Sequence, residues 1–150
     1  MDKLDQLYRQ VIMEHYKNPK NKGLINDDRY IKVHLDNPNC GDKIDVQVLL
    51  EDGQIKDIRH DGKGCSLCMS SASIMSELVK KKTLDRTKKI MYEFYDMMLG
   101  KEVSDEDLDE AIVYKSVSNF PARIKCVTLS WKALEEAIEE GEKDGEGQKK

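Results

Sequence analysis

The chain has 150 residues, of which 36% are charged and 39% hydrophobic, and its mean hydropathy is −0.68. This length suits one domain with a sizeable core. No apolar stretch approaches the ~20 residues of a membrane helix. The start of the chain lacks the basic end and apolar run of a signal peptide. We therefore expect a cytoplasmic protein that does not bind membranes.

The net charge of −4 resides near the end of the chain. Residues 135–150 contain seven acidic and three basic side chains, whereas residues 1–134 hold 22 of each sign. The basic footprint of a nucleic-acid-binding protein is missing, and the short lysine runs are interpreted as solvated helix faces. We expect a single domain over residues 1–140 and a charged, disordered tail over residues 141–150.

The first part of the chain predicts one helix followed by three strands. Apolar residues recur at helical spacing over residues 3–17, and a run containing proline and glycine ends that helix. Residues 30–35 and 44–50 alternate as strands, and an Asp-Gly hairpin signal leads to a third strand near residues 55–60. These strands predict an antiparallel meander.

The rest of the chain has helical spacing. We expect helices over residues 66–81 and 84–99, a short turn capped by Ser104, and a last helix opened by Pro121. Strands first and helices afterwards predict an α+β fold, in which the helices pack on one side of a three-stranded antiparallel meander. The apolar residues of the last helix that should face the core are Ile124, Leu129, Ala133, Leu134, Ala137 and Ile138.

Three of the four cysteines lie where this architecture can bring them together. Cys40 lies in a turn between strands, Cys65 at the junction of a strand and a helix, and Cys126 near the start of the last helix. Asp42 follows Cys40 with Gly41 between them, which lets the backbone bend and point both side chains inward. Three thiolates and one carboxylate form a tetrahedral set that zinc accepts. The dipole of the following helix would favour the thiolate of Cys65.

Other interpretations of these residues stay open at this point. Cysteines far apart in sequence can be small buried hydrophobes, and Asp42 can be a turn residue. Cys65 and Cys68 have the CxxC spacing of a redox dithiol, although the βαβ context of thioredoxin is missing. We interpret Cys68 as a packed thiol. Three histidines are interpreted as surface or helix-face residues rather than ligands: His15, His34 and His60.

The cysteines belong to three motifs. These are Asn37-Pro38-Asn39-Cys40-Gly41-Asp42, Gly64-Cys65-Ser66 with the following Ser70-Ser71-Ala72-Ser73, and Phe120-Pro121-Ala122-Arg123-Ile124-Lys125-Cys126. In this order, over residues from about 3 to 139, they resemble the U-type iron–sulfur cluster assembly proteins, the family of SufU, IscU and NifU. The IscU branch has a histidine ligand where this chain has Lys125, and its segment between the second and third cysteines is shorter. The sequence is therefore most similar to the SufU branch.

This resemblance implies zinc bound by Cys40, Asp42, Cys65 and Cys126. It also implies a sulfurtransferase that accepts persulfide sulfur from a PLP-dependent, SufS-like cysteine desulfurase and works with downstream iron–sulfur assembly proteins. We expect Cys40 to be the sulfur acceptor, because a turn can move away from a metal while helices hold the other two thiols. Arg123, one turn before Cys126, is a candidate for orienting Asp42 or a departing thiolate.

Two other functions would use the same residues. A scaffold would assemble a transient iron–sulfur cluster on the thiolates and transfer it to apo-proteins without acting as an enzyme. Lys125, in place of histidine, counts against that alternative. A purely structural zinc module would unfold whenever a ligand is replaced. The metal content of the purified protein and its effect on a desulfurase distinguish these functions.

Overall fold

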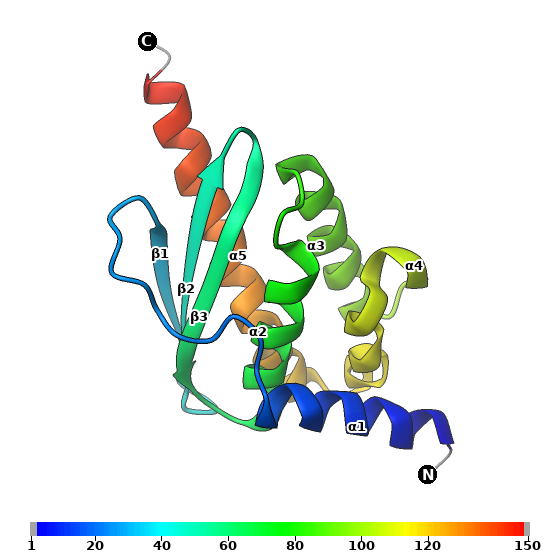
Figure 1. The fold of residues 1–150 in the computed structure, drawn as a ribbon. Helices are drawn as coiled ribbons and strands as arrows, with labels where there is room; N and C mark the ends of the chain where they lie inside the picture. Colours follow the sequence, from blue (N-terminus) through cyan, green and yellow to red (C-terminus); the bar gives the residue numbers. More distant parts are fainter. Residues whose placement is uncertain (1–2, 149–150) are drawn as a thin grey trace.

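The computed structural model describes the backbone of residues 3–148 and the side chains of residues 3–143. Figure 1 shows how the elements follow one another along the chain. They are α1 (Lys3–Lys17), β1 (Ile31–Asn37), β2 (Asp42–Glu51), β3 (Gln54–Lys63), α2 (Ser66–Val79), α3 (Leu84–Met98), α4 (Asp105–Leu108), the 3-10 helix η1 (Asp109–Asn119) and α5 (Pro121–Gln148). This order confirms the predicted α+β class. Among the described residues, no helix is long and apolar enough to cross a membrane.

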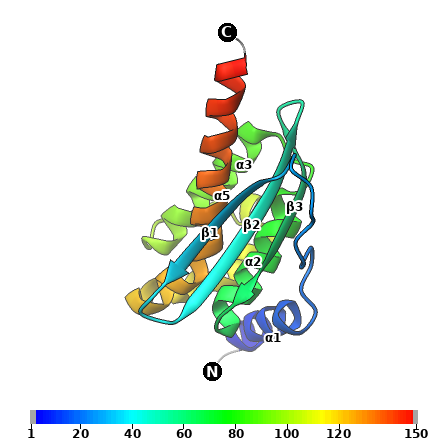
Figure 2. The same ribbon diagram turned by 90° about the vertical axis from the view of Figure 1, so that its left-hand side faces the viewer.

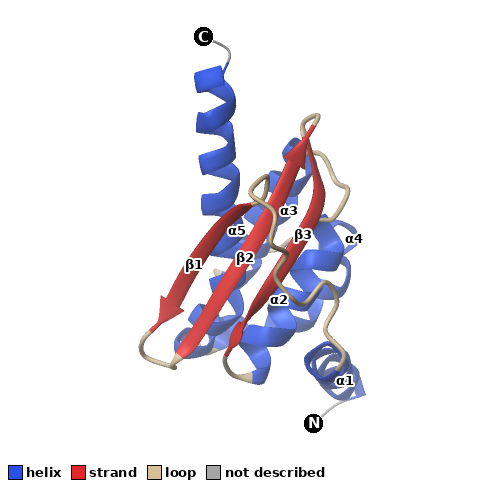
Figure 3. Ribbon diagram, turned by 60° about the vertical axis from the view of Figure 1, so that its left-hand side comes forward, coloured by secondary structure: helices blue, strands red, loops and turns tan. Residues whose placement is uncertain are grey.

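The three strands form one antiparallel sheet in the order β1-β2-β3, as predicted. Helices α2 and α5 pack against one face of the sheet, which Figures 2 and 3 show from its other side. The segment of residues 18–30 crosses that other side. This segment buries Gln47. The burial is tolerated because the side-chain amide of Gln47 donates to the carbonyl oxygen of Ile25 and accepts from the backbone amide of Ile25, both at 2.8 Å.

The two turns of the sheet lie at opposite ends of strand β2. Asp52 and Gly53 have φ values of +55° and +72°, which are those of a tight hairpin turn, as their sequence predicts. At the other end the strands run further than their alternation predicts, and Asn37 pairs with Asp42. Only residues 38–41 therefore connect β1 to β2, so the predicted turn around Cys40 is short and anchored on both sides.

The core lies between the sheet and the helices, and it is centred on aromatic residues from three elements. The rings of Phe94 in α3 and Trp131 in α5 are stacked, with centroids 4.2 Å apart, and Tyr114 of η1 meets Phe94 edge-on at 6.3 Å. All three side chains are fully buried. Stacking of this kind adds about 0.5–1.5 kcal/mol to the free energy gained from burial alone.

Helix α2 is buried on most of its surface, although it carries several serines. Ser71 shows why this is tolerated: its hydroxyl donates to the carbonyl oxygen of Val127 at 2.6 Å and accepts from the indole nitrogen of Trp131 at 3.1 Å. Because buried hydroxyls are stable only when hydrogen-bonded, Ser71 fixes α2 against α5. The two helices that carry Cys65 and Cys126 are thus held in register.

The last part of the chain differs from the sequence expectation in two ways. Residues 109–119 form a 3-10 helix that the sequence pattern did not predict, because i, i+3 spacing lacks the repeat used to recognise an α-helix. Helix α5 begins at Pro121 as predicted, and its backbone continues past Gly141 to Gln148. Gly141 lies so close to the sheet that a Cβ there would overlap the side chains of Ile31 and Leu50.

Candidate metal centre

Three segments that are far apart in sequence meet at the end of the sheet where β1 turns into β2. Figure 2 shows this turn beside the first residues of α5. The Sγ atoms of Cys40 and Cys126 lie 3.3 Å apart. Together with a carboxylate oxygen of Asp42, they form a group in which every pair of donor atoms is within 4.8 Å. The predicted convergence of Cys40, Asp42 and Cys126 is therefore present in the structure.

Asp42 connects the fourth predicted ligand to this group. Its carboxylate accepts a hydrogen bond from the backbone amide of Cys65 at 3.0 Å and lies 4.0 Å from the Cys65 Sγ atom. Cys65 is the N-cap residue of α2, where the positive end of the helix dipole favours a neighbouring carboxylate. Cys65 stands outside the tightest group of donors and borders it through Asp42.

The four predicted ligands differ in their exposure to solvent, which affects their tendency to ionise. Asp42 and Cys126 are each 1% exposed, Cys65 is half-buried and Cys40 is exposed. Burial, followed by the neighbouring Cys40 thiol and then by Cys65 and Asp42, raises the pKa of the Cys126 thiol. Among the described residues, no lysine or arginine forms an ion pair with the buried carboxylate of Asp42. A bound cation would offset the cost of burying that charge.

The donor set therefore fits zinc. Two thiols and one carboxylate converge, the Cys65 thiol borders them, and zinc prefers four such ligands in a tetrahedron. The thiolate is the form that binds metal, so the ion would also remove the proton that burial otherwise retains on Cys126. Harder ions such as magnesium or calcium favour oxygen ligands and do not suit this set.

Cys40 is the most accessible of the four donors. It lies in the turn of residues 38–41, and its backbone amide and that of Gly41 donate to the carbonyl oxygen of Asn37 at 3.2 and 2.9 Å. The side-chain amide of Asn37 is 3.4 Å from the Cys40 Sγ atom. Gly41 has a φ of +73°, which glycine adopts without strain. Asn37 thus organises the turn, a role that its place in the motif does not by itself predict.

Because Gly64 has no side chain, the Asp42 carboxylate can pack directly against its backbone. A Cβ atom at residue 64 would lie 2.6 Å from Oδ1 of Asp42 and 3.1 Å from its Cγ atom. Because Asp42 is short and buried, its carboxylate has to shift when that space is filled. A glycine is therefore required at residue 64 of the motif for a steric reason, which only the three-dimensional structure shows.

Replacing Gly64 by alanine is expected to lower the zinc affinity of the centre about 10-fold or more, since displaced supporting groups cost metal sites this much. Competition with a chromophoric chelator measures the affinity. The matched control is Gly53→Ala, at a turn where a Cβ meets nothing within 4 Å. Its positive φ makes that change mildly destabilising, but it lies at the far end of the sheet. Equal zinc affinities for the two variants would contradict this role of Gly64.

The remaining residues of the motifs lie around the centre rather than in it. Cys68 is fully buried in the core, and burial, followed by the charge of Asp42, raises the pKa of its thiol to about 12. It is therefore a packed, protonated thiol at neutral pH, which argues against the redox dithiol. Arg123 and Lys125 are both exposed on the first turns of α5.

The histidines differ from the sequence expectation. His34 is exposed between Asp36 and Asp45, as expected of a surface residue. The expectation is wrong for His60, which is fully buried and contacts the carbonyl oxygen of Lys20 at 2.7 Å through Nε2. His15 lies on a helix face as predicted, but it is buried. The sequence around His15 and His60 does not predict that they are buried, because segments distant in the sequence pack over both side chains.

Comparison with known proteins agrees with the fold and with these motifs. The NifU-like N terminal domain family matches residues 7–144, and the chain therefore belongs to this family. It is 50% identical over 141 residues to a Bacillus subtilis protein named zinc-dependent sulfurtransferase SufU, with 92% of this chain and 95% of the relative covered. It is 37% identical over 139 residues to the iron–sulfur cluster assembly scaffold protein IscU of Streptococcus pyogenes, covering 92% and 86%.

Solved structures show the same architecture. A SufU from Fervidobacterium islandicum, described as a proposed scaffold protein for the SUF system, superposes with a TM-score of 0.75 at 31% identity, covering 87% of this chain and 95% of that one. The N-terminal part of a NifU-like protein from Brucella abortus superposes with a TM-score of 0.80 at 25% identity, covering 93% and 97%. The predicted family and fold are thereby confirmed.

Proposed function

We propose that this chain is a cytoplasmic, zinc-dependent sulfurtransferase of iron–sulfur cluster assembly, which accepts persulfide sulfur from a SufS-like cysteine desulfurase. One observation carries the proposal. An exposed thiol, Cys40, sits on a short turn directly against the buried pair of Cys126 and Asp42. The name of the Bacillus subtilis relative, which is half identical to this chain, supports the same function.

The residues that would hold zinc are Cys40, Asp42, Cys65 and Cys126. Bound zinc would keep the thiols as thiolates near neutral pH. The protein contributes the arrangement: strand β2 and helices α2 and α5 hold three of the donors, whereas a turn of four residues carries the fourth. Cys40 is therefore the donor that a partner can reach from solvent while the others stay in place.

The transfer itself is a thiol–disulfide type of exchange. The Cys40 thiolate attacks the terminal sulfur of the desulfurase persulfide and forms a new sulfur–sulfur bond. The bond between that sulfur and the desulfurase cysteine breaks, and this cysteine leaves as a thiolate. One sulfur atom moves from one protein to the other, with no net oxidation or reduction.

A desulfurase would need a docking surface, and one apolar groove is lined by Ser66, the residue that follows Cys65. It runs between α1, the first turn of α2 and η1, and its apolar residues are Tyr8, Ile12, Leu67, Val113, Val117 and Phe120. Phe120, close to Cys126 in the chain, is 59% exposed. We propose this groove as the docking surface, since a contiguous apolar surface is typical of an interaction site.

The scaffold remains the second candidate function. Its support is that thiolates are the usual ligands of iron–sulfur clusters and that the Streptococcus pyogenes relative is named as a scaffold. In that case the cluster is cargo, bound by the same cysteines and passed to apo-proteins. The sulfurtransferase is favoured because Lys125, which is exposed, stands where the IscU branch has a histidine ligand.

The test measures alanine and sulfide formation by a purified SufS-like desulfurase, with and without the zinc-loaded chain. We expect the chain to raise the turnover several-fold, because an acceptor removes the persulfide that otherwise stays on the desulfurase. Chelator-treated chain is the control. No increase would refute the sulfurtransferase. A stable iron–sulfur species in native mass spectrometry after anaerobic purification, in place of zinc, would favour the scaffold.

A further inference from the structure

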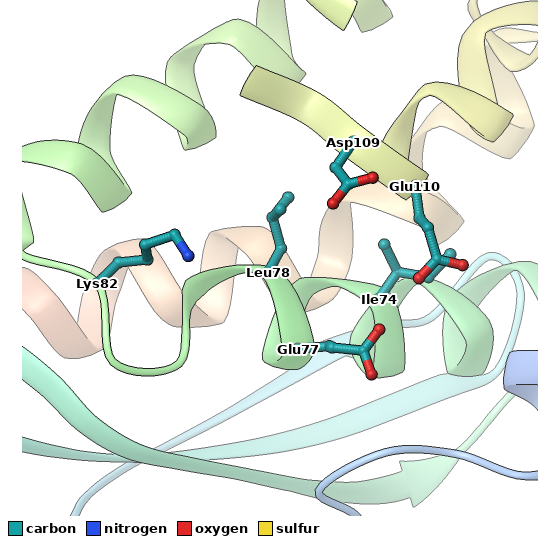
Figure 4. A pocket seen from close by; sticks show the side chains of 6 residues that line it. All are labelled: Ile74, Glu77, Leu78, Lys82, Asp109 and Glu110. Atoms are coloured by element: carbon teal, nitrogen blue, oxygen red, sulfur yellow. The ribbon is translucent and has the colours of Figure 1, made fainter. Parts of the chain in front are cut away.

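A second group of metal-binding side chains lies away from the cysteines, where three helices meet. It consists of His15 from α1, Glu77 from α2 and Glu110 from η1, whose donor atoms are all within 4.8 Å of one another. Figure 4 shows Glu77 and Glu110 on facing elements, with their carboxylates at the edge of a pocket that Asp109 also lines. These residues belong to none of the three sequence motifs.

His15 is fixed in an orientation that suits a ligand. It is only 5% exposed, and its Nδ1 atom lies 2.8 Å from the hydroxyl oxygen of Ser73. Its Nε2 atom lies 3.3 Å from both carboxylate oxygens of Glu110. In the tautomer in which Nδ1–H donates a hydrogen bond to Ser73, the lone pair of Nε2 faces the carboxylates of Glu77 and Glu110. A cation between Nε2 and these carboxylates would stabilise this arrangement.

The carboxylates are crowded as well. Glu77 and Glu110 each place a carboxylate oxygen within 4.8 Å of the other and of a ring nitrogen of His15. The charged groups around the pocket are Glu77, Asp109 and Glu110, with His15, Lys20 and Lys82 as the basic groups nearby. The three carboxylates outnumber the two lysines. Because Glu77 is exposed and Glu110 is only partly buried, an ion can reach the group from solvent.

We propose that His15, Glu77 and Glu110 form a second metal site, which binds one divalent transition-metal ion such as zinc, iron(II) or manganese(II). An imidazole with two carboxylates suits these ions, and the lack of a thiolate distinguishes the site from the cysteine centre. The two sites are separate, since Glu77 follows Cys65 along α2 by about 18 Å at 1.5 Å per residue. An ion there would link α1 to α2 and η1.

The experiment titrates manganese(II) into the chain loaded with one equivalent of zinc and follows free manganese by electron paramagnetic resonance. Manganese(II) binds weakly to thiolates, so it reports on oxygen and nitrogen ligands. We expect saturation at one manganese per chain. Glu77→Gln should weaken this binding about 10-fold or more, because a carboxylate ligand is lost. Glu136→Gln, an exposed carboxylate on α5, is the matched control and should bind as the wild type does.

Two further measurements show whether manganese binds at the second site rather than at the cysteine centre. Zinc content should be the same in Glu77→Gln as in the wild type, and Cys40→Ala should still bind manganese. Circular dichroism confirms that each variant is folded. Absence of saturable manganese binding, equal binding by Glu77→Gln, or loss of binding in Cys40→Ala would each overturn the proposal. None of these results depends on desulfurase turnover, so the proposed function is tested separately.

Discussion

Replacing Cys40 by alanine is expected to abolish sulfur transfer from the desulfurase while the fold stays intact. The transfer rate should fall about 100-fold or more, since the attacking thiolate is gone. The fold should survive because Cys40 is exposed on a turn and contributes little to the core. Single-turnover transfer of radiolabelled sulfur from the persulfide form of the desulfurase measures the rate directly, and circular dichroism measures the fold.

The control for this experiment is another cysteine of the same chain. Cys68→Ala removes a fully buried thiol outside the group of donors, at a cost of about 1 kcal/mol for the small cavity. It should transfer sulfur as fast as the wild type. If Cys40→Ala retained the label as well as the wild type did, Cys65 or Cys126 would be the acceptor instead. If Cys68→Ala lost transfer, the packed-thiol interpretation would be wrong.

Replacing Trp131 by alanine is expected to lower the free energy of unfolding by about 3–5 kcal/mol, the usual range for a large buried aromatic. The side chain is fully buried, is stacked on Phe94 at 4.2 Å, and donates to the hydroxyl of Ser71. Its loss would remove the stack and loosen α2 against α5. Urea unfolding followed by circular dichroism measures the change.

Trp131→Phe separates the two contributions. It keeps an aromatic ring against Phe94 but removes the indole N–H donated to Ser71, which should cost about 1–3 kcal/mol because a buried hydroxyl loses a partner. Zinc affinity should fall in the alanine variant more than in the phenylalanine variant, since α2 and α5 carry Cys65 and Cys126. A loss of less than about 1 kcal/mol in Trp131→Ala would contradict this assignment of the core.

Local patterns were sufficient to predict much of the fold. The alternation of β2, the Asp52-Gly53 turn and the proline at residue 121 each predicted an element that the structure contains. These signals depend only on neighbouring residues. The 3-10 helix of residues 109–119 was missed because its buried residues Ala111, Tyr114 and Val117 recur every three positions, which is not the repeat of an α-helix.

The metal centre was predicted differently. Convergence of Cys40, Cys65 and Cys126 with Asp42 was expected from the architecture, and their choice as ligands from the motifs of the family; the structure groups Cys40, Asp42 and Cys126 tightly and leaves Cys65 at the edge. The steric role of Gly64 could not be predicted from the sequence, because it depends on the position of the Asp42 carboxylate, which lies in strand β2. The group of His15, Glu77 and Glu110 was missed for a similar reason: only the packing of three helices brings these residues together.

The Cys40–Cys126 contact has a consequence for when the set of donors is complete. The two residues are separated by 86 positions, and Cys126 needs α5 to be seated against the sheet before its thiol can reach Cys40. During synthesis, the earlier segments emerge from the ribosome well before that helix does. A nascent chain therefore exposes Cys40, Asp42 and Cys65 without the thiol that completes their set. The complete set of donors therefore forms only after α5 has been synthesised and packed against the sheet.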